Sequence, residues 1–597
     1  MSTEASLADR VLEGLDAEQR AVATSFGRPV VVLAGAGTGK TRAITHRIAY
    51  GAATGALQAR HTLAVTFTSK AAAELRHRLA GLGVPRVQAR TFHAAALRQL
   101  SYFWPRVNGV ELPPVANGTF GLIAEAARAL PVSIETPLLR DLAAEISWAK
   151  VSNVPSERYI ELAAKARREV DGLDAEQVAS VLLRYEQVKK HRGVIDFDDI
   201  LLCAIALLHE HPEVADEVRD QYRHFTVDEY QDVSPIQRTL LELWLGERSD
   251  ICVVGDPNQA IHTFAGAQPA YLTGFTRDHP DAFTLKLRTN YRSTPQVLDA
   301  ANALIGRDAR LRATRDAGPD VEVIPASDEQ TEAAATVAWL VDHHRAGMAW
   351  NQSAVLYRIN AQSEALVDEL RAAKVPYAVR DAEHQDRSDD AVTLSTIHSA
   401  KGLEWEAVAM IGLSDGLLPF IMADTPAAIA EEKRLLYVGL TRARTELRLS
   451  WAQGGTVGRG RREPSRFLRA AGLVEPASAA GPRTKGVRTR KPRTLPSCHV
   501  CGKALSDAVE IKLGRHTDCV ADFDEQLFDA LREWRWEEAQ TQSVPAFVVF
   551  TDATLRALAE QRPEELANLT KIPGIGPAKC ERYGNQIIEV IADHASD

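Results

Sequence analysis

The stretch Val30-Val-Val-Leu-Ala-Gly-Ala-Gly-Thr-Gly-Lys-Thr41 predicts an apolar strand that runs through a glycine-rich turn into a helix. The glycines let backbone N–H groups converge on phosphate at a helix N-terminus. Lys40 can reach the β and γ oxygens of a nucleotide, and the Thr41 hydroxyl can hold Mg²⁺. The usual first glycine of such a loop is Ala34 here, which is a small departure. We predict an ATP-binding loop formed by Ala34, Gly35, Ala36, Gly37, Thr38, Gly39, Lys40 and Thr41.

A second motif, Val227-Asp-Glu-Tyr-Gln-Asp232, supplies acidic groups for hydrolysis. An apolar strand ends there in adjacent carboxylates. Asp228 can therefore hold Mg²⁺ through water, and Glu229 can activate the attacking water as general base. Two acids after a strand are weak evidence alone. Together with the glycine-rich loop they predict a hydrolytic site that uses ATP and Mg²⁺.

Short apolar runs alternate with amphipathic helical stretches from about residue 15 to residue 470, which predicts an α/β fold of stacked βα units. Residues 91–195 interrupt this series with a mainly helical pattern and are expected to form an inserted helical subdomain. A second α/β series starts near Phe283. Buried parallel strands are expected at 30–33, 63–67, 225–228, 251–254, 354–357, 392–394 and 408–411.

The order of the motifs resembles the UvrD/Rep/PcrA group of superfamily 1 DNA helicases over roughly residues 12–470. The segments that carry the resemblance are Leu15-Asp-Ala-Glu-Gln19, Val254-Gly-Asp-Pro-Asn-Gln259, Leu287-Arg-Thr-Asn-Tyr-Arg-Ser293, Lys401-Gly-Leu-Glu404 and Leu436-Tyr-Val-Gly-Leu-Thr-Arg-Ala-Arg444. The resemblance implies two RecA-like P-loop NTPase domains with a helical insertion. The implied boundaries are 1–90 and 196–282 for domain 1A, 91–195 for subdomain 1B, and 283–470 for domain 2A.

The same resemblance implies how the nucleoside of ATP is held. Gln19 would read the adenine edge with Arg42 beside it, Tyr291 would stack on the base, and Glu404 would lie near the ribose.

The resemblance also implies which groups meet the charge that develops on the γ-phosphoryl group. Gln259 would sense that phosphate, and two arginines from the second domain would stabilise it when the cleft closes. The expected catalytic residues are Lys40, Asp228, Glu229, Gln259, Arg292 and Arg442.

A motor that moves on a strand needs polar contacts to phosphates and aromatic platforms for bases. The segments that resemble the family's DNA-facing motifs offer both, although a lone Phe after a strand is more often a core residue. Ala265 stands where the family usually has arginine, so a phosphate contact is either missing or supplied elsewhere. The expected DNA contacts are Phe67, Thr68, Thr91, His93, Phe264, Arg358, Asn360, Thr396 and His398.

In the family a further domain, called 2B, is inserted after the segment that resembles residues 354–380. In this chain only the polar tract 381–391 stands at that place. We therefore expect 2B to be absent, by natural loss or by excision. No expected ATP-site residue lies in the gap, so DNA-stimulated ATP hydrolysis should survive while duplex engagement and its regulation change.

The C-terminal part differs in composition from the motor. Residues 471–497 form a basic, Pro- and Gly-containing segment, which is either a solvated linker or a tether that contacts nucleic acid. Pairs of metal-ligating residues then follow with zinc-ribbon spacing, and reduced unpaired cysteines are the alternative. The expected Zn²⁺ ligands, within residues 498–520, are Cys498, Cys501, His516 and Cys519.

Residues 521–597 show apolar positions at helical spacing and resemble an HRDC domain. The turn Ile572-Pro-Gly-Ile-Gly576 also resembles a helix-hairpin-helix, whose glycines would expose N–H groups to phosphate beside Lys579. A module that contacts only proteins is weighed equally. The combination of motor, cysteine motif and HRDC domain resembles the second UvrD-type helicase of actinobacteria.

Bulk composition fits this interpretation. The 597 residues are 45% apolar and 25% charged, with a net charge of −9 that leaves room for a local basic groove. There is no apolar run of membrane-spanning length and no signal-peptide pattern at the start, so a cytoplasmic, nucleoid-associated bacterial protein is expected.

These observations predict an ATP-dependent 3′→5′ translocase and helicase of DNA repair or replication, with the polarity implied by the resemblance alone. Its expected partners are single-stranded DNA, 3′-tailed duplex DNA and repair proteins bound through the tail, and its oligomeric state is open. One alternative is the motor subunit of a helicase–nuclease complex, which would need a nuclease domain after the motor. The other is a DNA-binding scaffold with a dead P-loop, which the intact ATP-site residues argue against.

Overall fold

A computed structural model of the chain divides into two compact units, residues 1–479 and residues 480–597. The residues that the structure describes are 7–128, 130, 135–380, 390–454, 462–474, 525–541, 549–550, 552–563, 565–569, 572, 575 and 577–593. Among them, no helix combines the length and the hydropathy that crossing a membrane requires.

The first unit contains a six-stranded parallel sheet in which the P-loop strand β1 lies between β5 and β6. Its four inner strands are almost fully buried, as parallel strands covered on both faces are, whereas the edge strands are partly exposed. In spatial order they are β3 (Gln88–Thr91), β2 (Thr62–Thr66), β4 (His224–Val227), β5 (Ile251–Gly255), β1 (Val30–Ala34) and β6 (Phe283–Leu287).

Helices cover both faces of this first sheet. One face packs against α1 (Leu7–Leu12), α2 (Ala17–Ala23), α3 (Lys40–Thr54) and α4 (Ser69–Gly81). The other face packs against α5 (Phe92–Asn108), α10 (Asp199–Glu210), α11 (Pro212–Gln221), α12 (Pro235–Leu245), α13 (Ala270–Thr273) and α14 (Phe275–Asp278).

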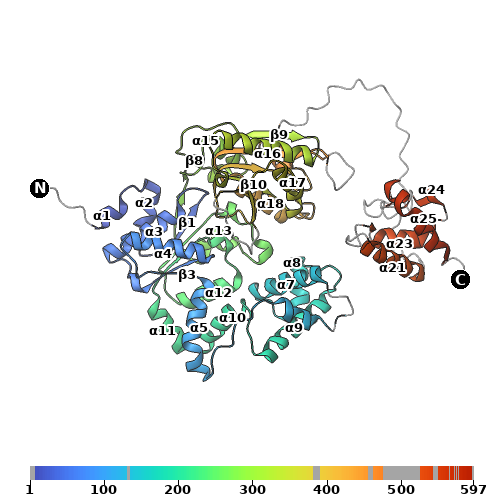
Figure 1. Cartoon of the computed structure of the whole chain (residues 1–597). Coiled ribbons are helices and arrows are strands. Elements are labelled where there is room, and N and C mark those ends of the chain that lie inside the picture. The colour runs from blue at the N-terminus through green and yellow to red at the C-terminus, as the bar shows by residue number, and fades with distance from the viewer. Residues whose placement is uncertain are drawn as a thin grey trace, which may run out of the picture. The chain divides into compact units, whose positions relative to one another are not determined.

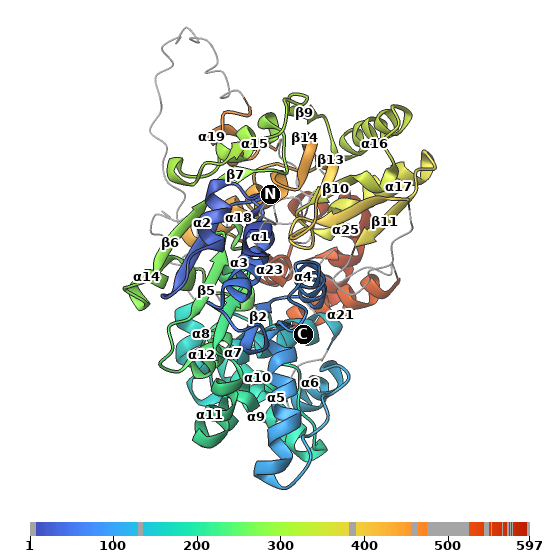
Figure 2. The ribbon, with the colours of Figure 1, turned by 90° about the vertical axis from the view of Figure 1, so that its left-hand side faces the viewer.

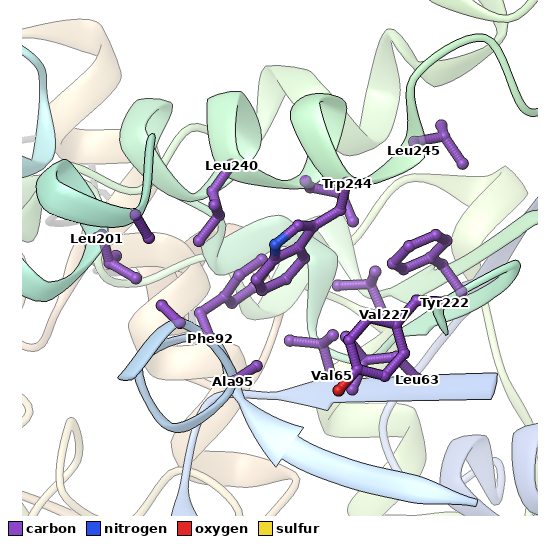
Figure 3. Packing of buried hydrophobic residues seen from close by; sticks show 14 of the residues in the cluster. Leu63, Val65, Phe92, Ala95, Leu201, Tyr222, Val227, Leu240, Trp244 and Leu245 are labelled. Carbon is purple, nitrogen blue, oxygen red and sulfur yellow. The ribbon is translucent and has the colours of Figure 1, made fainter. Parts of the chain in front are cut away.

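The core on the second of these faces corrects the expected start of the helical insertion. Figure 3 shows Phe92 and Ala95 of α5 among residues of the sheet and of α12. The rings of Phe92 and Trp244 stack with centroids 6.0 Å apart. Residues 92–108 therefore belong to the core of the first sheet, because their apolar face completes its cover.

The insertion has a core of its own. Its helices are α6 (Phe120–Ala127), α7 (Thr136–Val151), α8 (Tyr159–Ala166) and α9 (Ala175–Arg192), of which the last three are labelled in Figure 1. Buried ion pairs join it to α10, since the Nζ of Lys150 lies 2.6 Å from Asp196 and that of Lys189 lies 2.6 Å from Asp199. Removing one member of such a network would leave an uncompensated buried charge, so the network fixes the insertion on the sheet.

The second sheet is also six-stranded and parallel, and it has two apolar faces. Figure 2 shows α16 (Glu329–Arg345) and α17 (Ser363–Ala372) on one side of it and α15 (Pro295–Asn302) and α18 (Pro426–Leu440) on the other. The short α19 (Arg466–Ala470) packs on the same face as α15. The strands are β11 (Tyr377–Arg380), β12 (Val392–Thr396), β10 (Ser353–Tyr357), β13 (Trp405–Met410), β14 (Ala443–Ala452) and β9 (Glu322–Ala326).

Strand β6 stands at the expected start of the second domain, residue 283, and belongs to the first sheet. It pairs with β1 from Val30↔Phe283 to Ala34↔Leu287, and is therefore the edge strand of the first sheet. A short pair, β7 (Thr289–Asn290) and β8 (Arg312–Ala313), follows it. The second α/β unit begins only after these residues.

The place at which the family carries domain 2B, which we expect to be absent here, lies between two neighbouring strands of the second sheet. β11 and β12 pair in parallel from Tyr377↔Val392 to Arg380↔Ser395. Of the tract 381–391 that joins them, residues 381–389 lie outside the described residues.

The second unit has an apolar core of its own, which includes Leu527, Leu531 and Tyr583. Its described helices are α21 (Glu525–Thr541), α23 (Asp552–Gln561), α24 (Leu566–Leu569) and α25 (Pro577–Asp593). Lys579 donates to the carbonyl oxygen of Val549 over the ring of Phe550. The basic segment 475–497, the four expected zinc ligands and the glycines of the 572–576 turn lie outside the described residues.

Candidate nucleotide site and DNA track

The P-loop of the structure is a tight cradle between β1 and the N-terminus of α3. Gly37 and Gly39 have φ angles of 67° and 77°, which side-chain-bearing residues rarely adopt. A Cβ atom at Gly37 would lie 2.6 Å from the Cβ of Arg292, and one at Gly39 would lie 2.7 Å from Nε2 of Gln19. The loop therefore needs glycine at these positions, and its N–H groups suit a phosphate.

Lys40 begins α3 and faces the acidic residues at the ends of β4 and β5. Its Nζ lies 3.4 Å from Oε1 of Glu229. Burial alone would lower the pKa of Lys40, because it disfavours the charged amine. The carboxylates of Glu229, Asp256 and Asp228 have the larger combined effect and raise the pKa of Lys40. The lysine is therefore a permanent cation at the position where nucleotide phosphates would compete with Glu229 for it.

Asp228 and Glu229 share this site but differ in charge preference. Burial and the neighbouring Glu229 raise the pKa of Asp228. Burial also works against ionisation of Glu229, but Lys40 and Lys401 prevail and lower its pKa. Glu229 also has a positive φ of 53°, a strained conformation of the kind found at functional sites. An ionised Glu229 fits a general base, and the hard oxygens of Asp228 and Thr41 fit Mg²⁺.

The residues expected around adenine lie at the mouth of the P-loop. Nε2 of Gln19 donates to the carbonyl of Thr38 at 3.1 Å, and Arg42 donates to that of Gly14 at 2.9 Å. The Tyr291 hydroxyl pairs with Asp16, and burial with this hydrogen bond raises its pKa to about 12. The ring of Tyr291 is exposed and is available for stacking.

The two expected arginine fingers lie together at the boundary between the sheets. The guanidinium of Arg292 lies 2.5 Å from a carboxylate oxygen of Glu404. Arg442 is fully buried, and its side chain donates to Val438 O, Leu403 O and Thr441 Oγ1.

Arg442 carries a buried charge that no carboxylate of the described residues neutralises by direct contact. Burial and the neighbouring Arg292 lower its pKa to about 9. Because an unpaired buried cation is costly, this site suits a ligand with concentrated negative charge, as the phosphates of ATP have.

Several contacts join the two sheets at this point. The motifs had assigned no role to three of the side chains involved, Lys401, Asp232 and Asn290. Lys401 pairs with Asp232 and donates to the carbonyl of Gln259 at 2.8 Å. Asn290 donates to Ala36 O at 2.7 Å, which ties the segment after β6 to the P-loop. Lys401 lies in the motif 401–404 and Asn290 in the motif 287–293, so their presence in a motif was the one sequence feature that could have indicated a role.

Gln259 and Glu404 already have partners in the structure. The Gln259 amide donates to Asp256 at 2.6 Å, and Asp256 also influences Lys40 electrostatically. Glu404, expected near the ribose, pairs instead with Arg292 and with Arg444 at 3.6 Å. Gln259 is therefore bound to Asp256 and Glu404 to Arg292, and we expect Asp256 and Arg292 to lie near the phosphates.

The DNA contacts expected on the first sheet lie at its carboxyl edge, where α4 and α5 begin. The hydroxyls of Thr68 and Thr91 each accept an N–H at 3.1 Å and cap these helices. Phe67 is half-buried against Phe92. His93 stacks on the exposed ring of Phe197 at 3.9 Å, and burial lowers its pKa to about 4, so it is neutral at physiological pH.

The contacts expected near the second sheet lie close to one another. Phe264 is 57% exposed, and its ring centroid lies 5.7 Å from that of His398. Thr396 donates to Ser399 at 3.1 Å. Arg358 lies 2.8 Å from Glu432, so its charge is neutralised in this conformation.

Asn360 and the surroundings of Phe264 also bear on the expected DNA contacts. Asn360 is exposed. At the position after Phe264, where arginine was missing, Arg168 of the insertion donates to the Phe264 carbonyl at 3.2 Å. A guanidinium therefore does reach this position, although it is paired with Glu145 at 2.7 Å.

A glycine-cradled lysine, an acid pair and arginines from a second sheet define a P-loop ATPase with two α/β domains. Family models match the chain as the UvrD/REP helicase N-terminal domain at 15–280, the UvrD-like helicase C-terminal domain at 285–385 and 379–454, and the HRDC domain at 524–591. The last match confirms the predicted HRDC domain.

Curated relatives agree with these matches. The chain is 39% identical to the ATP-dependent DNA helicase UvrD2 of Mycobacterium tuberculosis, over 98% of this chain and 99% of that protein. It is 35% identical to UvrD1 of the same species, over 63% of this chain and 50% of that protein. It is 31% identical to the PcrA helicase of Staphylococcus epidermidis, over 62% of this chain and 51% of that protein. The chain belongs to the UvrD-like family of ATP-dependent DNA helicases and is an ATP-hydrolysing enzyme that binds DNA.

Proposed function

We propose that the chain moves 3′→5′ along single-stranded DNA and separates duplexes that carry a 3′ tail, in DNA repair or replication. The observation that carries the proposal is the continuity between nucleotide and DNA residues. Gln259, expected at the γ-phosphate, and Phe264, expected at the DNA, lie five positions apart, and His398 lies three positions before Lys401. A change at the phosphates therefore reaches the strand through short, rigid segments.

Lys401 would transmit closure between the two domains. It extends from the second sheet to Asp232 and to Gln259 on the first. Hydrolysis removes the γ-phosphate to which Gln259, Arg292 and Arg442 would respond, so the domains would open and close once per ATP. We assign binding of the phosphates to residues 34–41, binding of Mg²⁺ to Thr41 and Asp228, and base catalysis to Glu229.

The absence of domain 2B is part of the same proposal. The alignment with UvrD2 spans 697 positions, whereas this chain has 597 residues, so the relative carries residues that this chain lacks. The C-terminal model matches in two pieces that meet at 379–385. Both observations support a lost insertion at this place, and duplex contacts would then depend on the motor itself and on the tail.

Strand separation on tailed duplexes tests the polarity. We expect a duplex with a 3′ single-stranded tail to be unwound at least about tenfold faster than one with a 5′ tail. The control is a chain that ends at residue 474, which would show what the tail contributes. Equal rates on both tails, or faster unwinding from the 5′ tail, would contradict the proposed direction.

The cysteine motif is proposed to hold a structural zinc ion. Cys498, Cys501, His516 and Cys519 offer the soft, tetrahedral donor set that Zn²⁺ prefers. We expect native mass spectrometry to show one zinc per chain, and replacing Cys498 and Cys501 with serine to abolish it. The free thiols Cys203 and Cys580 are controls whose loss should leave zinc in place. Native protein without zinc would refute the assignment.

A further inference from the structure

The ring of Phe264, where the strand is expected to stack, is carried by a very short turn. It stands in the middle of the 3₁₀ helix η5 (Thr263–Ala265) and is 57% exposed. A turn of three residues has few hydrogen bonds of its own. A ring on such a turn can meet a base in a fixed orientation only if the backbone beneath it is held by neighbouring groups.

Arg168 of the insertion is one of these neighbours. It follows α8, and its Nη1 donates to the carbonyl oxygen of Phe264 at 3.2 Å. Glu145 of α7 orients the guanidinium, because its Oε2 accepts from both Nε and Nη2, at 2.9 Å and 2.7 Å. Glu145 is itself buried, and its other oxygen accepts from the Tyr159 hydroxyl at 2.8 Å. A planar guanidinium that is held along one edge has a fixed orientation, and here it directs Nη1 toward the turn.

The turn is also in close contact with the end of α7 and with the second domain. A Cβ atom at Gly266 would lie 2.6 Å from Cγ2 of Val151, so the backbone after Phe264 lies directly against α7. At the start of the turn, Glu431 of α18 accepts the Thr263 N–H at 3.0 Å. The backbone of the turn is therefore held by the insertion and by the second domain, while the ring remains exposed.

We propose that Arg168 is a positioning residue for DNA binding, which holds the backbone of Phe264 so that its ring stacks on a base of the single strand. The proposal rests on the proposed function, since it needs that ring to meet the strand. Arg168 would act through geometry, because Glu145 already neutralises its charge at 2.7 Å. The insertion would thus help to set the affinity of the motor for the strand.

The test replaces Arg168 with lysine. Lysine keeps a positive charge beside Glu145, but its single ammonium group lacks the planar fork that reaches Glu145 and Phe264 together. We expect the concentration of single-stranded DNA that gives half-maximal stimulation of ATP hydrolysis to rise at least about threefold, because part of the stacking contact is lost. The kcat at saturating DNA should change by less than about twofold, since the guanidinium contacts Glu145, Trp148 and Phe264. Arg167→Lys, at the exposed neighbouring residue, is the matched control and should change neither value.

A double-mutant cycle shows whether Arg168 acts through the ring. Phe264→Ala alone should raise the half-maximal DNA concentration at least about fivefold, as the loss of one stacked base does. In the Phe264→Ala background, Arg168→Lys should have no further effect, whereas independent contacts would multiply to about fifteenfold. Glu145→Gln/Arg168→Gln removes both charges together and leaves no buried carboxylate uncompensated, so it provides the same comparison if Arg168→Lys lowers the melting temperature.

The outcomes separate this proposal from the proposed function. An Arg168→Lys protein with the DNA dependence of the wild type would overturn the positioning role. Effects that multiply in the cycle would also overturn it, because Arg168 would then contact the strand itself. If Phe264→Ala leaves the half-maximal DNA concentration unchanged, the stacking contact of the proposed function is wrong, and the positioning role falls with it.

Discussion

Replacing Lys40 with alanine is expected to lower kcat for ATP hydrolysis by at least about 100-fold and to abolish unwinding. The Lys40 ammonium is close to Glu229 and is influenced by Asp228 and Asp256. Without it, three carboxylates would face the incoming phosphates with no cation in the P-loop, and the transition state would lose a charge-assisted hydrogen bond.

The fold should survive this substitution, because Lys40 lies outside the apolar cores on the two faces of the first sheet. The matched control is Lys286→Ala, an exposed lysine on β6 of the same sheet, which should leave kcat unchanged. Thermal unfolding and steady-state hydrolysis of both variants provide the measurement. DNA remodelling that persists in the Lys40→Ala protein would favour the scaffold alternative.

The proximity of the P-loop and the acid pair could be predicted from the sequence, because both follow the ends of strands. In a parallel sheet these ends lie at one edge, so the loop after β1 and the acids after β4 must meet. The positive φ angles of Gly37 and Gly39 explain why glycine stands there. The family and the HRDC domain were also predicted correctly, since motif order and spacing carry that information.

Domain boundaries could not be predicted as well. The helical pattern of residues 92–108 is the same in a separate subdomain as in a helix that covers a sheet, and only the packing of Phe92 on Trp244 distinguishes them. Likewise, the sequence of β6 predicts a strand but does not show which sheet it joins. Its pairing with β1 places it in the first sheet.

Contacts between distant segments were also beyond the sequence. No spacing rule connects Lys401 to Asp232, or Arg358 to Glu432, because each pair spans a large part of the chain. Arg168 is a further example. The family's arginine is missing at Ala265, and the sequence does not reveal that Arg168 of the insertion contacts the neighbouring Phe264 instead. Such pairs depend on tertiary packing within and between the domains, which local patterns do not specify.

The central claim is that ATP hydrolysis is coupled to a DNA strand through contacts between the two sheets. The most direct test is the steady-state ATPase rate of the purified chain with and without single-stranded DNA. Because the strand would favour the closed arrangement that brings Arg292 and Arg442 to the phosphates, we expect at least about tenfold stimulation. Phe264→Ala should weaken this stimulation without changing the rate measured in the absence of DNA. An ATPase rate that single-stranded DNA leaves unchanged would contradict the account.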